Sequence, residues 1–132
     1  MTENPITTWH RMIHDRSPLG LDALLDENAV FFSPVVHAPQ VGRELTAKYL
    51  SAALHVFVNP TFHYVREIIG TNDAMLEFET EIDGIVVTGV DIIKWNEAGK
   101  ITEFKVMLRP LKAVNLIHQM MGAMLQVGQR PS

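Results

Sequence analysis

The chain has 132 residues, 47% hydrophobic and 20% charged, with a formal net charge of -4. This composition suits one globular domain and argues against intrinsic disorder. The acidic balance does not support nucleic-acid binding, and a chain without cysteine has no disulfide or thiolate chemistry. We expect a single domain over residues 1–132, with residues 110–128 as a C-terminal helical extension. We also expect a cytoplasmic protein without a signal peptide and without membrane association.

The first half of the sequence predicts three helices and one interrupted strand. Residues 5–16 form the first short helix, and residues 21–26 form a second with leucines on one side. Residues 29–36 are rich in β-forming side chains but contain a proline, so this strand lies at an edge or bends there. A longer helix follows over residues 43–57, where apolar side chains recur at helical spacing.

The second half predicts four strands and a final helix. The strands cover residues 61–69, 74–82, 85–95 and 100–109, and an Asp-Gly turn joins the middle two. The helix over residues 111–127 is rich in methionine, so it could cover a cavity, join a dimer contact or pack on its own domain. Helices followed by an antiparallel meander indicate an α+β fold, with helices on one face of a curved antiparallel sheet.

The strand over residues 85–95 is apolar on both of its faces. Val87 and Ile93 point to one side, and Val90 and Ile92 point to the other. If helices cover the first face, something else must cover the second. We expect a second copy of the chain there, which gives a homodimer across the outer sheet face. The alternative is that the C-terminal helix folds back over that face.

One acid, Asp91, stands within this apolar strand. A carboxylate in such surroundings is costly to ionise, so it is expected to have a partner or a task. In the functional interpretation it is a cavity acid whose raised pKa lets it donate or accept a proton. In the structural interpretation it is a buried acid bonded to a tryptophan, a histidine or the backbone.

Three histidines are further candidates. His37 follows the first strand in a loop, where it could shuttle protons or pair with Asp91, although exposed loop histidines are common. His10 and His14 have the i, i+4 spacing of metal ligands, but no third ligand accompanies them. We therefore expect no metal site and no cofactor.

The sequences LDALLDENAVFFSPVV at residues 21–36, GRE at 42–44 and VDIIKWNEAGKITEFKVMLRP at 90–110 carry a family resemblance. Over residues 9–109 the chain resembles the nuclear transport factor 2-like superfamily, and within it the SnoaL-like group. The resemblance implies a sheet curved around the N-terminal helices into a cone, with an apolar cavity open at one end. It implies no single activity, because the superfamily includes isomerases, cyclases, dehydratases, epoxide hydrolases and non-catalytic binding proteins.

Within that superfamily the ketosteroid isomerases offer the most informative comparison. Asp91 falls where they keep an acid that donates a hydrogen bond to the substrate oxyanion. Their general base is an aspartate just before the Pro-Val of the first strand, where this chain has Ser33. Their other oxyanion donor is a tyrosine of the first helix, and this helix has none. Because a serine hydroxyl is no base unless a neighbour takes its proton, steroid isomerisation is not predicted.

The resemblance also points to the residues that would bind a small hydrophobic molecule. The expected cavity wall consists of Trp9, Tyr49, Phe78, Thr80, Phe104, Val106 and Leu108.

Two classes of function stay open. In the first, Asp91, helped by His37 or Ser33, performs cofactor-free acid–base chemistry such as isomerisation, cyclisation, dehydration or epoxide opening. In the second, the protein is a non-catalytic ligand-binding or dimeric interaction module. A second polar group that converges on Asp91 would favour catalysis.

Overall fold

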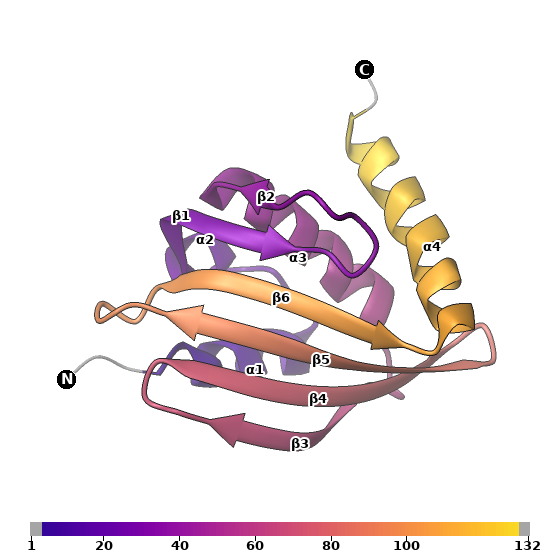
Figure 1. Ribbon diagram of the computed structural model, residues 1–132, viewed down its shortest axis with the longest axis horizontal. Coiled ribbons are helices and arrows are strands. Elements are labelled where there is room, and N and C mark those ends of the chain that lie inside the picture. The colour runs from indigo at the N-terminus through magenta and orange to yellow at the C-terminus, as the bar shows by residue number, and fades with distance from the viewer. Residues whose placement is uncertain (1–3, 130–132) are drawn as a thin grey trace.

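The computed structural model describes residues 4–129. In chain order its elements are α1 (Pro5–Asp15), α2 (Leu21–Leu24), β1 (Leu25–Phe32), β2 (Gln40–Val41), α3 (Arg43–Phe57), β3 (His63–Ile69), β4 (Asp73–Ile82), β5 (Ile85–Trp95), β6 (Ile101–Arg109) and α4 (Leu111–Gln129). The strands form one sheet in the order β2-β1-β6-β5-β4-β3 (Figure 1). The helices pack against one face of this curved, open sheet, as the α+β prediction required.

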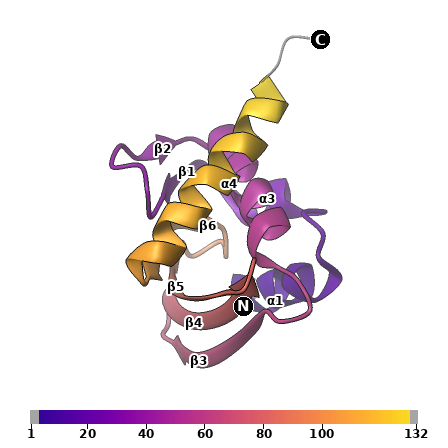
Figure 2. The same cartoon turned by 90° about the vertical axis from the view of Figure 1, so that its right-hand side faces the viewer.

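The sheet is mixed rather than wholly antiparallel. Strands β3 to β6 form the predicted antiparallel meander, but β1 pairs with β6 in parallel. Helix α3 follows the antiparallel pair β1–β2 and leads into the meander on the inner side of the sheet. This long connection allows β1 and β6 to lie side by side in parallel. Viewed from the end of the sheet, the curved strands β3 to β5 lie below α3, α1 lies beside them, and α4 crosses in front (Figure 2).

Two predicted boundaries near the first strand were wrong. The helix expected over residues 21–26 is shorter, because β1 already begins at Leu25. The strand expected over residues 29–36 ends at Phe32. There the Ser33 hydroxyl oxygen accepts the backbone N–H groups two and three residues further on, at 3.1 and 3.3 Å, and this turn ends the strand. The short strand β2 was not predicted.

The strand faces follow the predicted alternation in the centre of the sheet. Asp91 lies opposite Leu76 of β4 and Val106 of β6, and all three are buried. Val87 and Ile93, on the same face of β5, are fully buried beneath the helices. The acid of β5 therefore points into the core between sheet and helices.

Helix α4 packs on its own domain and leaves the outer sheet face open. Among its described side chains, those of Ala113, Ile117 and Met121 are buried and join the core on the helical side of the sheet. On the outer face Val86 and Met107 stay 51% and 52% exposed, so the alternative in which the last helix covers that face is wrong. Among the described residues, no helix combines the length and apolarity needed to cross a membrane.

Candidate functional site

A chain of side-chain hydrogen bonds ends on the buried acid of β5. The Tyr64 hydroxyl donates to Asp91 Oδ2 at 3.0 Å, and Trp9 Nε1–H donates to the Tyr64 oxygen at 2.8 Å. The chain thus joins α1, the edge strand β3 and the central strand β5. Asp91 Oδ1 has no such partner among the residues that the structure describes.

Burial determines the proton affinity of both groups. It raises the pKa of Asp91 from 3.8 to about 7, while the hydrogen bond from Tyr64 acts in the opposite direction by stabilising the carboxylate. Burial and the nearby Asp91 carboxylate raise the pKa of Tyr64 well above its usual range. The phenol therefore keeps its proton, whereas the carboxyl group takes up and releases one near neutral pH.

An extra residue in β3 aims Tyr64 at this acid. Val65 is unmatched in the pairing of β3 with β4, and this bulge places both Tyr64 and Glu67 on the helical side of the sheet. Glu67 Oε1 lies 2.6 Å from His10 Nε2 of α1. The His10 ring in turn meets the Tyr64 ring edge to face at 5.4 Å. These contacts fix α1 on β3 and hold the phenol in place.

Asp91 opens onto a small apolar cavity among α1, α3 and strands β4 to β6. Its volume is about 30 Å³, and its lining includes Ile13, Leu54, Phe57 and Phe62. A space of this size holds one water molecule, whereas small-molecule pockets usually have about 300 Å³ or more. In this conformation the aromatic and aliphatic side chains fill the interior, so a larger ligand requires some of them to move.

Four of the seven residues expected in the cavity wall lie there, namely Trp9, Phe78, Phe104 and Val106. The other three lie elsewhere in the fold. The Thr80 hydroxyl is buried and donates to a backbone carbonyl of α3 at 3.1 Å. The Tyr49 ring packs against a phenylalanine of β1 at 5.5 Å between ring centres. Leu108 is half-buried, further along β6.

The structure places Ser33 and His37 together but away from Asp91. Both line an open groove of about 720 Å³ between the loop after β1 and strand β6. Val106 lies between this groove and the cavity of Asp91, since it contributes to both linings. The Ser33 hydroxyl is engaged by its own turn, and His37 is exposed. Neither residue lines the cavity.

The polar group that converges on Asp91 is Tyr64, which the sequence interpretation missed. The only available signal was a tyrosine within a predicted strand, and the residues around it show no alternation that assigns it to a face. Of the two helix histidines, His10 contacts Glu67 and His14 contacts Asp15. Among the described residues no group of three or more potential metal ligands occurs.

Comparison with known proteins places this chain in a family. The sequence model of a protein family described as a SnoaL-like domain matches residues 6–104. The chain belongs to the SnoaL-like family. No match was found among proteins with curated descriptions.

Solved structures resemble this SnoaL-like domain over most of its length. A steroid delta-isomerase from Pseudomonas aeruginosa is 31% identical, with a TM-score of 0.89 over 95% of this chain and 91% of that chain. An uncharacterized protein with a cystatin-like fold from Silicibacter pomeroyi is 30% identical, with a TM-score of 0.82 over 90% of this chain and 83% of that one. A protein of unknown function from Mesorhizobium loti, described as NTF2-like, shares the fold at 20% identity and a TM-score of 0.70, over 80% and 88% of the two chains.

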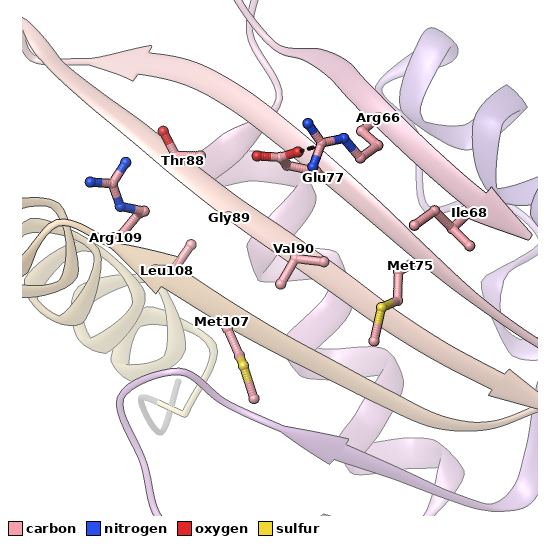
Figure 3. A pocket seen from close by; sticks show the side chains of 10 residues that line it. All are labelled: Arg66, Ile68, Met75, Glu77, Thr88, Gly89, Val90, Met107, Leu108 and Arg109. Carbon is pink, nitrogen blue, oxygen red and sulfur yellow. Dashed lines mark ion pairs between the residues drawn. The ribbon is translucent and has the colours of Figure 1, made fainter.

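The outer sheet face of this SnoaL-like domain carries a separate apolar hollow of about 330 Å³ (Figure 3). Ile68, Met75 and Met107 spread over it from β3, β4 and β6, and they are 61%, 48% and 52% exposed. At its margin Arg66 Nε lies 3.7 Å from Glu77 Oε1. This face is open in the single chain.

Proposed function

We propose that this SnoaL-like domain binds a small, mostly hydrophobic molecule and transfers a proton on it through Asp91. The observation that carries the proposal is the Trp9–Tyr64–Asp91 chain, which ends at a cavity with an acid whose pKa is about 7. At neutral pH such a group is present in both protonation states, which is the condition for efficient general acid–base catalysis. The reaction class is isomerisation or a related proton transfer, and it needs no cofactor.

Each group has a distinct task in this proposal. Ionised Asp91 takes a proton from an activated C–H bond of the ligand onto Oδ1 and returns it to a second position, so no net proton is consumed. Tyr64 stays protonated and donates to Oδ2 throughout, which stabilises the carboxylate between turnovers. Trp9 orients the phenol by its own N–H donation. Tyr64 and Trp9 are therefore positioning residues, and Asp91 is the acid–base group.

The Pseudomonas aeruginosa relative, named a steroid delta-isomerase, supports an isomerase-type reaction. Steroid isomerisation itself is not proposed, because Ser33 stands where ketosteroid isomerases have their base and lies in a different groove. Steroids are nevertheless reasonable probes beside terpenoids, lactones and aromatic acids.

The test combines binding with proton exchange. Ligands from that panel are screened by the melting temperature, which rises by mass action when a ligand binds the folded state. Each hit is then incubated in deuterium oxide, and exchange of its C–H protons is followed by NMR. We expect wild type and the control variant Glu97→Gln to catalyse this exchange, and Asp91→Asn not to catalyse it. Equal exchange in the presence of Asp91→Asn would refute the role of Asp91.

Non-catalytic ligand binding is the second candidate function. Its support is the 30 Å³ cavity, together with the fact that Asp91 already has a protein partner in Tyr64. In that case ligands found in the screen bind more weakly to Asp91→Asn than to wild type, and none of their C–H protons exchanges. The exchange measurement thus separates the two candidates.

We further infer that two copies of the chain associate through their outer sheet faces. Glu79, Thr88 and Arg109 lie in one row across β4, β5 and β6. A two-fold axis along β5 lays β4 of one copy over β6 of the other, so Glu79 faces Arg109 of the partner subunit. The apolar hollow is buried between the two faces in this arrangement.

Sedimentation equilibrium tests this association. Val90→Lys puts a charge in the centre of the face and is expected to give monomers. Glu79→Arg and Arg109→Glu should each weaken the dimer, and the double variant should restore it. A monomeric wild type, or a double variant weaker than either single one, contradicts the arrangement.

A further inference from the structure

Another groove lies on the helical side of the molecule, between the end of α1, helix α3 and helix α4. Its volume is about 470 Å³, which is within the range of small-molecule sites. Leu54 and Val58 line this groove and also line the cavity of Asp91. Their side chains are therefore the partition between the two spaces, and their movement would join them.

The ionisable residues in the described lining of this groove are all basic. They are Arg16, Lys48 and His55, whereas the chain as a whole has a net charge of -4. Arg16 is the left-handed C-cap of α1, with a φ of 52°, and its backbone N–H donates to carbonyls of the last turn. Lys48 and His55 are seven residues apart on α3, so they project from the same side two turns apart. Asp15, next to Arg16, contacts His14 and does not line the groove.

The rest of the groove is mostly apolar. Leu54 of α3 and Val58, directly after α3, line it together with Met124 and Leu125 of α4, and all four are at least half-buried. A groove that combines cationic groups with aliphatic side chains complements a molecule with one anionic end and an apolar body.

We propose that this groove binds an amphipathic carboxylate, with its carboxylate between Arg16 and Lys48 and its apolar part directed past Leu54 and Val58 toward Asp91. This inference rests on the proposed function, because it names the class of molecule whose apolar end reaches the acid–base group. The 30 Å³ cavity then needs to admit only the reacting end of the ligand, since the groove holds the remainder.

Calorimetric titration with decanoate tests the carboxylate site, with decanol as an uncharged molecule of equal length and decyltrimethylammonium as a cation. The double variant Arg16→Gln/Lys48→Gln removes two groove cations. Its matched control, Arg43→Gln/Lys112→Gln, makes the same charge change at exposed positions outside the groove. We expect decanoate to bind wild type and the control alike, and the groove variant about tenfold more weakly. Added salt should weaken decanoate binding but not decanol binding.

The path of the apolar end is tested with decanoate brominated at its terminal carbon. Trp9 lines the inner cavity, and a Trp95→Phe background leaves it as the only tryptophan emitter. We expect the bromine to quench the fluorescence of Trp9. At low ligand concentration this quenching should be lost in the variant Arg16→Gln/Lys48→Gln.

Equal affinities for decanoate and decanol, or an equal loss in the control variant, would overturn the assignment. Charge-dependent binding without quenching of Trp9 would overturn the path toward Asp91. Failure of the proposed function has a different signature, in which groove binding and quenching persist while Asp91→Asn leaves proton exchange unchanged.

Discussion

Replacing Asp91 by asparagine should stabilise the protein at alkaline pH, although it removes the group on which the proposed chemistry depends. Asparagine has nearly the same shape, carries no charge, and its amide oxygen can still accept the Tyr64 hydroxyl proton. The variant should therefore fold, and any difference from wild type reports the ionisation of the acid.

The magnitude follows from the change in proton affinity on folding. The pKa of Asp91 is 3.8 in the free state and about 7 in the folded protein. Between these values the folded form holds a proton that the unfolded form has released, so stability falls as the pH rises. The contribution is fully present below 3.8 and is lost by the time the pH exceeds the folded pKa. At about 1.4 kcal/mol per unit, the loss over the whole interval is about 4 kcal/mol.

Urea unfolding at several pH values measures how much the ionisation of Asp91 contributes to the free energy of unfolding. The free energy of unfolding of Asp91→Asn, relative to wild type, should increase by about 3 kcal/mol between about pH 5 and about pH 8. Glu97→Gln, which changes an exposed loop acid, should follow the wild-type profile. Parallel profiles for Asp91→Asn and wild type would refute the reasoning, since they would show that folding leaves the proton affinity of Asp91 unchanged.

Three further variants test the hydrogen bond to the acid and the packing of two glycines. Tyr64→Phe removes the hydrogen bond that favours the carboxylate, so the pKa of Asp91 should rise above its wild-type value in a carboxyl-carbon NMR titration; a fall would contradict the geometry. Gly89→Ala places a Cβ 2.5 Å from Phe78 Cζ and should destabilise by about 1–3 kcal/mol in urea unfolding. Gly122→Ala meets no atom within 4 Å in α4 and should stabilise by about 0.5–1 kcal/mol, so equal effects of the two alanines would contradict the packing.

The sequence predicts most of the fold because its strong signals are local. Alternation along β4 and the Asp-Gly turn determine the central hairpin, and the turn residues Asp83 and Gly84 adopt φ values of 51° and 76° as such a hairpin requires. The parallel position of β1 was not predictable in this way, because pairing between distant strands leaves no periodic pattern in either one.

The candidate site was predictable only in part. Asp91 stands out because it is the one acid in an apolar strand. Ser33 gave a misleading signal, since its hydroxyl stabilises the turn after β1 and its side chain belongs to another groove. The cavity volume depends on how about a dozen side chains from distant parts of the sequence pack together, and no local sequence pattern predicts that packing.

Tyr64 escaped prediction for a reason that bears on function. A regular strand would put Tyr64 and Glu67 on opposite faces, because side chains alternate with a period of two. The extra residue Val65 brings both to the helical side, where one bonds Asp91 and the other pairs with His10. One irregularity in an edge strand thus supplies both the partner of the buried acid and the anchor of the helix that carries Trp9. A bulge that serves two contacts at one site indicates that the geometry around Asp91 is organised as a unit, and this is why Tyr64 and Asp91 should be tested together.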